Sequence, residues 1–344
     1  MRFLKIIILL ILLSACSTAT PPAEPTIAQV VSPTAEQGSA PADTAATLSS
    51  LEQLDEYPFY VMRYIGDYVY PKISTSLPGQ SQFACALFAA MGFPADMFYG
   101  RNFDWEYSPA LLLFTDPPDG YASVSMVDLT FLGIPAEKAA ALQNLQTTYQ
   151  DAMLNAPALP FDGMNEYGLA IGMAAIPEEY IDDASYDSSR PDIGSIGIIR
   201  QVLDHARNVE QALSIFKQFN VMFSGGPPIH YLIADPSGKA VLVEFFNGEM
   251  VVLPNESPWH LATNHLRCIA EGDGGCPRYH KLNEQLTASG GQLDTSAALK
   301  LLSDVKQGIT QWSSVYNMSS GDISIVIGQA YDKAFSFHLD LVNP

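Results

Sequence analysis

The stretch CALFAAMGFPADMFYGRNFDW, which occupies residues 85–105, carries the strongest structural signal in this chain. It opens with an apolar run, passes through Gly-Phe-Pro-Ala-Asp at 92–96, which has the residue types of a turn, and ends in a second strand-like run. We therefore predict a hairpin. Its second strand would return Arg101 and Asp104 to the beginning of the first strand, where Cys85 stands.

The residue types at the two ends of this hairpin suit a nucleophile. Arg101 follows Cys85 by 101 − 85 = 16 residues, and Asp104 follows it by 104 − 85 = 19. A guanidinium beside a thiol favours the thiolate, and a carboxylate orients an ammonium or amine. The alternatives are a buried structural thiol and a structural Arg–Asp pair, but the spacing of the three residues favours catalysis.

No other motif competes with this one. The sequence has no G-x-S-x-G, P-loop, H-E-x-x-H or G-x-G-x-x-G segment. Its six histidines are scattered, and none is placed convincingly against a nucleophile. We expect no cofactor and no catalytic metal.

Strand and helix signals alternate in blocks along the rest of the chain. Strands are predicted at residues 110–114, 169–175, 231–234, 240–246, 250–253, 313–316, 323–327 and 334–339, and helices at residues 196–206, 208–219, 279–286 and 296–306. Two packed sheets covered by helices satisfy this order.

The N-terminal part predicts export. Residues 1–16 combine a basic start, a short apolar run and Leu-Ser-Ala-Cys, which resembles the lipobox of bacterial lipoproteins. Acylation of Cys16 would anchor the protein on the outer side of a bacterial membrane; an ordinary secretory signal is the alternative. Residues 17–50 have the composition of a flexible tether, and residues 51–84 are apolar enough to pack, partly as helix, on a main domain at 85–344.

The cysteines and the net charge predict how two of the thiols are paired and exclude one class of binding partner. In an exported protein Cys268 and Cys276 are expected to form a disulfide; a zinc site with His265 and His280 is the alternative. The formal charge of −20, from 37 acidic and 17 basic residues, argues against nucleic acid as a partner. The oligomeric state stays open, with a homo-oligomer allowed.

Several short motifs then resemble one family, the choloylglycine hydrolases, which include bile salt hydrolases and penicillin V acylases and, more distantly, acid ceramidase and N-acylethanolamine acid amidase. The matching segments follow Cys85 in the family's order: Gly100-Arg101-Asn102-Phe103-Asp104-Trp105, Asp162-Gly163-Met164-Asn165-Glu166-Tyr167-Gly168-Leu169, His230-Tyr231-Leu232-Ile233-Ala234-Asp235, Leu261-Ala262-Thr263-Asn264 and Pro277-Arg278-Tyr279. Together they cover the chain from about residue 85 to its end.

This resemblance implies an α+β fold, a four-layer αββα sandwich of the N-terminal-nucleophile hydrolase type. It implies that the chain cuts itself between Ala84 and Cys85, so that Cys85 gains a free α-amine that serves as its base. The thiolate would form a thioester with the acyl half of a small N-acyl amide, which water then hydrolyses. Acyl transfer to an amine, or a non-catalytic ligand-binding lipoprotein, are the alternatives.

The resemblance also assigns roles within the site. The Asn264 side chain and a backbone N–H at Ala175 would stabilise the oxyanion, and Arg278 would complete the polar network; Asn264 could instead simply end a strand. Two departures stand out. Ala175 stands where bile salt hydrolases have Asn, and the long apolar piece at 51–84 resembles that of acid ceramidase, which stays bound after cleavage.

Overall fold

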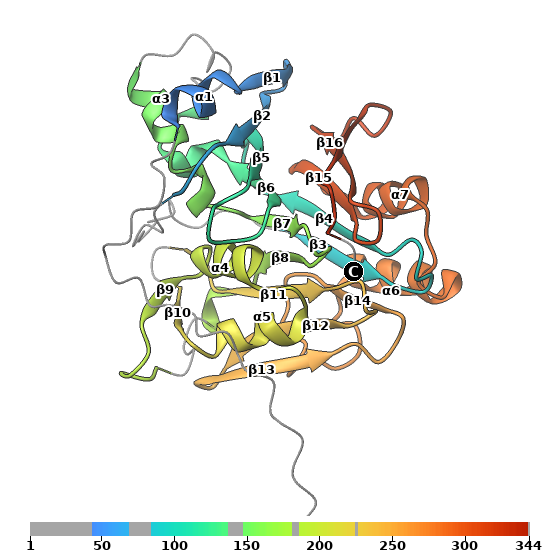
Figure 1. The fold of residues 1–344 in the computed structure, drawn as a ribbon. Helices are drawn as coiled ribbons and strands as arrows, with labels where there is room; N and C mark the ends of the chain where they lie inside the picture. Colours follow the sequence, from blue (N-terminus) through green and yellow to red (C-terminus); the bar gives the residue numbers. More distant parts are fainter. Residues whose placement is uncertain (1–42, 69–83, 137–146, 181–185, 224–225, 343–344) are drawn as a thin grey trace, which may run out of the picture. The chain divides into compact units, whose positions relative to one another are not determined.

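The computed structural model describes residues 43–68, 84–136, 147–180, 186–223 and 226–342 (Figure 1). Within these residues the strands form two large sheets, of nine and six strands, and one small parallel pair. The nine-stranded sheet has the order β1 (Glu52–Asp55), β2 (Phe59–Tyr64), β5 (Ala110–Thr115), β6 (Ser123–Asp128), β7 (Asp162–Asn165), β8 (Ala170–Ala175), β11 (Ile229–Ala234), β12 (Ala240–Phe246), β13 (Glu249–Pro254). The six-stranded sheet has the order β14 (Trp259–Ala262), β3 (Ala86–Ala90), β4 (Phe98–Asp104), β15 (Thr310–Asn317), β16 (Asp322–Ile327), β17 (Ala334–His338).

The remaining elements are short strands and helices. The small pair joins β9 (Asp192–Gly194) and β10 (Asn220–Met222), and the α-helices are α1 (Thr44–Ser49), α3 (Thr147–Met153), α4 (Gly197–His205), α5 (Val209–Phe216), α6 (Pro277–Ser289) and α7 (Thr295–Val305). No helix among the described residues combines the length and the apolar character that crossing a membrane requires.

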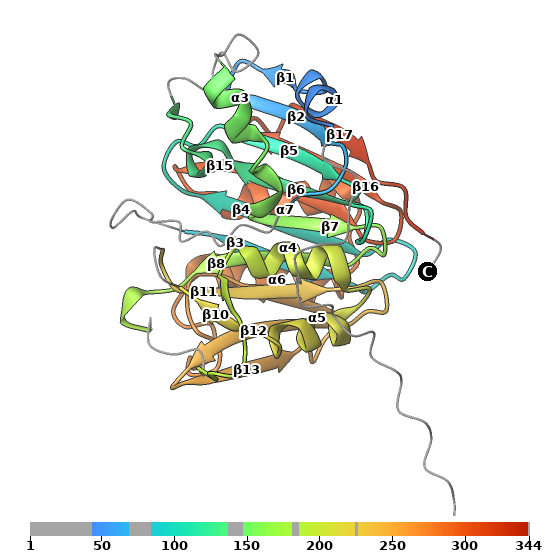
Figure 2. The ribbon, with the colours of Figure 1, turned by 60° about the vertical axis from the view of Figure 1, so that its left-hand side comes forward.

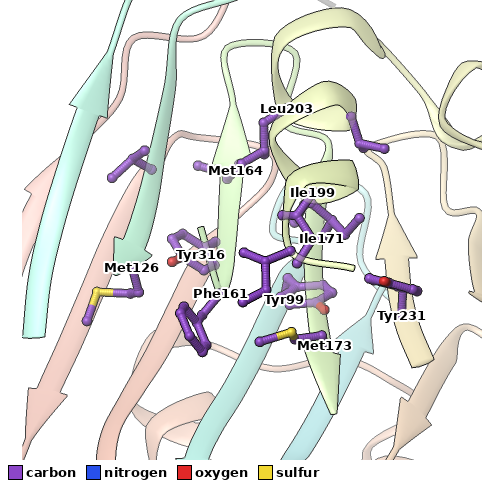
Figure 3. Close-up of a cluster of buried hydrophobic side chains, with 14 of the residues drawn as sticks. Tyr99, Met126, Phe161, Met164, Ile171, Met173, Ile199, Leu203, Tyr231 and Tyr316 are labelled. Carbon is purple, nitrogen blue, oxygen red and sulfur yellow. The ribbon is translucent and has the colours of Figure 1, made fainter. Parts of the chain in front are cut away.

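The two large sheets pack face to face. A Cβ added to Gly172 of β8 would lie 2.8 Å from the Tyr99 hydroxyl of β4 and 3.1 Å from Leu87 Cδ2 of β3, so only glycine allows the sheets to approach this closely. The Tyr99 hydroxyl donates across the interface to the Leu232 carbonyl of β11 at 2.9 Å. Figure 3 shows Tyr99 within this core.

Helices cover both outer faces of this pair of sheets (Figure 2). On the nine-stranded sheet, Leu203 of α4 lies against Gly163 of β7, where a Cβ would be 3.0 Å from Leu203 Cδ1. On the six-stranded sheet, α6 and α7 form a separate buried cluster with the outward-facing side chains of β3 and β4, including Phe88 and Phe98. The layers are therefore helix, sheet, sheet, helix, as the predicted αββα sandwich requires.

Strands β3 and β4 form the predicted hairpin, with Leu87 opposite Arg101. The Ala84 N–H donates to the Asp104 carbonyl at 3.3 Å, which extends the pairing to the residue before Cys85. Side chains alternate between the two faces of a strand. Cys85 and Arg101 therefore point between the sheets, whereas Asp104 points to the face covered by helices.

The segment before Cys85 corrects two predictions. Residues 51–84 were expected to pack partly as helix, but the described residues 52–64 form β1 and β2, and β2 pairs in parallel with β5. Its sequence Phe-Tyr-Val-Met-Arg-Tyr is rich in aromatic and β-branched residues, which favour strands. The expected tether to residue 50 is also too long, because α1 begins at Thr44 and the fully buried Thr47 accepts the Ile65 N–H at 2.9 Å. Residues 1–42 and 69–83, including the predicted signal and most of the tether, lie outside the described residues.

Candidate active site

Cys85 directly precedes β3 and is 3 % exposed. Its Sγ lies 3.9 Å from Nη2 of Arg101, which is fully buried. Burial alone would lower the pKa of Arg101, but the neighbouring Asp162 carboxylate and Cys85 outweigh it and raise that pKa. The structure therefore places a permanent positive charge beside the sulfur, as the hairpin predicted.

Asp162 of β7 holds that guanidinium in place from the opposite sheet. Arg101 Nη1 lies 2.6 Å from Asp162 Oδ2, and both side chains are excluded from solvent. The other carboxylate oxygen accepts hydrogen bonds from Ser314 at 3.0 Å and Tyr316 at 2.6 Å, both on β15. Sequence reasoning quoted Asp162 within a motif but gave it no role, because its contact with Arg101 exists only once the sheets are packed.

Asp104 does not lie beside the sulfur, which corrects the prediction for this residue. Its side chain is on the other face of β4, where Oδ1 accepts a hydrogen bond from Thr310 and Oδ2 has no hydrogen-bond partner among the described residues. Burial raises the pKa of Asp104 to about 7 against the opposing effects of Thr310, Arg278 and Arg101. Its position opposite Ala84 puts it beside the peptide bond that precedes Cys85, rather than beside the thiol.

Asn264 and Arg278 approach Cys85 from the other edge of β3. The register of β14 with β3 pairs Ala262 with Leu87, and two further residues bring Asn264 opposite Cys85. Arg278 in the first turn of α6 donates from Nη1 to the Cys85 carbonyl and from Nη2 to Asn264 Oδ1, the second bond being 3.1 Å long. The structure thus brings together the residues that the sequence motifs placed far apart.

The Ala175 backbone lies within reach of the same amide. Asn264 Nδ2 donates to the Ala175 carbonyl at 2.6 Å, which leaves the second hydrogen of that amide for another acceptor. The Ile176 N–H donates to the Pro228 carbonyl of the segment before β11. Because backbone groups alternate in direction in antiparallel pairs, the Ala175 N–H points away from β11, toward the side on which Asn264 lies.

Cys268 and Cys276 are free thiols, so the predicted disulfide is not formed in this structure. The two residues are held by different partners: the Cys268 N–H donates to Glu244 at 2.8 Å, whereas the Cys276 sulfur accepts from Thr263 at 3.4 Å. Burial and the Glu244 carboxylate raise the pKa of Cys268 to about 12. Burial also opposes ionisation of Cys276, but hydrogen bonds from His265 and Thr263 lower its pKa to about 6.

The described residues offer no set of side-chain donors for a metal ion. No group of three or more His, Cys, Asp or Glu side chains is arranged among them to hold a metal ion. The arrangement instead offers a buried thiol beside a fixed cation, with amide and backbone donors on its other side. Such a combination suits attack on a carbonyl carbon and stabilisation of the resulting oxyanion.

Comparison with known proteins supports this interpretation of the fold. The profile of the acyl-coenzyme A:6-aminopenicillanic acid acyl-transferase family matches residues 160–336. A mutant of the conjugated bile acid hydrolase from Clostridium perfringens superimposes with a TM-score of 0.56 at 16% identity, over 75% of this chain and 93% of that one. Penicillin V acylase from Agrobacterium tumefaciens gives a TM-score of 0.53 at 16% identity, over 74% and 87% of the two chains.

One curated relative matches only a small part of this chain. An uncharacterized protein of Paramecium bursaria Chlorella virus 1 is 33% identical over 110 residues, and the match spans 30% of this chain and 38% of that protein. The family profile covers 336 − 160 + 1 = 177 of the 344 residues, which is more than half. The chain therefore belongs to the acyl-coenzyme A:6-aminopenicillanic acid acyl-transferase family and has the αββα fold of the N-terminal-nucleophile hydrolases.

Proposed function

We propose that this protein is a cysteine N-terminal-nucleophile amidase that hydrolyses the linear C–N amide bond of an N-acylated small molecule. The observation that carries the proposal is the buried Cys85 sulfur 3.9 Å from Arg101 Nη2, with Asn264 joined through Arg278 to the Cys85 carbonyl. The conjugated bile acid hydrolase and the penicillin V acylase that share its fold support this chemistry.

Activation requires the α-amine of Cys85 to be released. The Cys85 sulfur would attack the Ala84 carbonyl carbon, the peptide C–N bond would break, and the nitrogen would take up a proton to become the free amine. Water would then hydrolyse the Ala84 thioester and regenerate the thiol. Asp104, with its pKa near 7 and an unpartnered oxygen beside this peptide, is suited to exchange the proton with the departing nitrogen.

The catalytic cycle would repeat the same steps on the substrate. The Cys85 amine takes the thiol proton, and the thiolate adds to the amide carbonyl. Asn264 Nδ2 and the Ala175 N–H donate to the oxyanion, and Arg101 holds its positive charge beside the sulfur. The C–N bond then breaks as the amine leaves with the proton, and water hydrolyses the thioester to a carboxylic acid.

The piece that precedes Cys85 is proposed to stay bound after cleavage. Strand β2 lies between β1 and β5 within the nine-stranded sheet, and Phe59, Tyr60 and Met62 are fully buried. Beyond it, the Tyr68 hydroxyl donates to the buried Asp204 of α4 at 2.8 Å. Removing this piece would expose the sheet and its core, so cleavage of one peptide bond gives no reason for it to dissociate.

Acyl transfer is the second candidate function, and the description of the matching family favours it. The same thioester would form, but an amine acceptor rather than water would attack it. An extracytoplasmic location, through a lipid anchor on Cys16, is proposed from the sequence.

The first experiment is intact mass and N-terminal sequencing of the protein expressed without residues 1–16, followed by a panel of N-acyl amides. We expect one fragment to begin at Cys85, with a second fragment that copurifies, and amide turnover that Cys85→Ala abolishes. Adding amine acceptors to the turnover assay separates transfer from hydrolysis, because transfer yields a new amide. An uncut chain without turnover, or turnover retained in Cys85→Ala, would contradict the proposal.

A further inference from the structure

A buried histidine and glutamate that the proposed mechanism does not use lie beside the oxyanion donors. His230 of β11 and Glu244 of β12 are both fully excluded from solvent, and His230 Nδ1 lies 2.9 Å from Glu244 Oε1. Desolvating such a pair is costly unless its remaining hydrogen-bonding groups are satisfied. The hydrogen-bond partners of the two side chains show which segments of the chain this pair fixes.

His230 holds the residue directly before Asn264. Its Nε2 lies 2.7 Å from the Thr263 carbonyl, which can only accept, so Nε2 carries a hydrogen. The Nδ1 atom lies 2.9 Å from the Glu244 carboxylate. Both ring nitrogens are thereby committed, which leaves the imidazole no alternative orientation.

Glu244 holds the loop that follows. Its Oε1 accepts the Arg267 N–H and its Oε2 accepts the Cys268 N–H, each at 2.8 Å. With the bond to His230, this carboxylate has three donors. Burial opposes its ionisation, but the hydrogen bond and charge of His230, together with the backbone hydrogen bonds of Arg267 and Cys268, outweigh that effect and lower its pKa.

The His230–Glu244 pair connects the two sheets close to the Asn264 side chain and the Ala175 N–H. Thr263 and Asn264 follow β14 of the six-stranded sheet, whereas His230 and Glu244 belong to the nine-stranded sheet. In the β11–β8 register His230 lies opposite Ala174, the neighbour of Ala175. The backbone of His230 therefore fixes the strand that carries one donor, and its side chain fixes the residue before the other.

We propose that His230 and Glu244 are positioning residues that set the distance between the Asn264 side chain and the Ala175 N–H, the two donors to the oxyanion. They act through the Thr263 carbonyl. This inference rests on the proposed amidase function and adds to it the residues that align the oxyanion hole.

A double-mutant cycle tests the proposal on the processed enzyme. We expect His230→Gln to lower kcat about 10- to 100-fold with little change in KM, because a misplaced donor acts on the transition state alone. In an Asn264→Ala background the same change should lower kcat less than about 2-fold, because the donor it positions is already gone. His338→Gln is the matched control, since its Nδ1 also lies 2.9 Å from a carboxylate, that of Asp322, but both are exposed on β16 and β17.

If His230→Gln does not yield processed enzyme by intact mass, Glu244→Gln goes through the same cycle. Equal loss of kcat in both backgrounds, an unchanged kcat, or loss of folding in both variants would overturn the proposal in favour of a purely structural pair. Failure of the amidase function itself looks different, since the unmodified enzyme would then show no turnover that depends on Cys85.

Discussion

The ion pair between Arg101 and Asp162 makes a sharp quantitative prediction. In Asp162→Asn the side chain keeps its volume, and Ser314 and Tyr316 can still donate to its oxygen, but the negative charge that faces the Arg101 guanidinium is lost. Both partners are excluded from solvent, with Nη1 and Oδ2 2.6 Å apart. The guanidinium would stay buried without its counter-ion, which typically costs about 3–5 kcal/mol of folding stability.

Thermal unfolding of the uncleaved Cys85→Ala chain measures this cost without interference from processing. With an unfolding entropy of about 2.1 cal/mol/K per residue over about 300 residues, a loss of 1 kcal/mol lowers Tm by about 1.6 °C, so Asp162→Asn is expected to lower it by roughly 5–8 °C. In an Arg101→Met background the same change should cost much less, because no buried cation remains. Glu210→Gln, which breaks the exposed pair with Lys239, is the control and should leave Tm nearly unchanged. Equal effects of Asp162→Asn in both backgrounds would refute the reasoning.

Three further predictions concern the site. Asn264→Ala should lower kcat about 10²–10³-fold with little change in KM, since an oxyanion donor acts mainly on the transition state; a change in KM alone in steady-state kinetics would contradict that role. The raised pKa of Asp104, about 7 against 3.8 for the free side chain, means that the folded state binds more protons between these values, so this residue's contribution to stability falls as pH rises from about 4 to 7. In urea unfolding, the stability of the Cys85→Ala/Asp104→Asn variant relative to Cys85→Ala alone should therefore rise between pH 4 and 7. A difference that does not change with pH would contradict the raised pKa. Finally, iodoacetamide at pH 7 should label Cys276, with its pKa of about 6, faster than Cys268, with its pKa of about 12, whereas a Cys268–Cys276 disulfide in the mass spectrum would restore the original pairing prediction.

Elements with a strong local pattern were predicted well. Helix α4 lies within the helix predicted at residues 196–206 and α5 within that predicted at 208–219, and Asn208 caps α5 by accepting the Gln211 N–H at 3.0 Å. The strands predicted at residues 240–246 and 250–253 correspond to β12 and β13, and the turn between them has Asn247 and Gly248 at positive φ, which an Asn-Gly dipeptide favours. In each case the deciding contacts lie within a few residues of one another.

Elements that depend on distant partners were missed. Strand β2 pairs in parallel with β5, and its apolar residues alone did not distinguish a strand from a packed helix. Strand β7 was not among the predicted strands, and Asp162, which it carries, was given no role. The expected disulfide failed for a related reason, because compartment and proximity in sequence say nothing of the separate partners that hold Cys268 and Cys276.

By itself, the sequence determined that the Cys85 sulfur lies beside the Arg101 cation, because a hairpin brings the two residues together across a separation of only 16 residues. The tertiary structure decided everything that completes the site. Arg101 meets Asp162 across 61 residues, Asn264 meets Ala175 across 89, and Arg278 meets Cys85 across 193. Such contacts follow from the order of strands and the packing of two sheets, which burial of the whole core selects and no local pattern encodes.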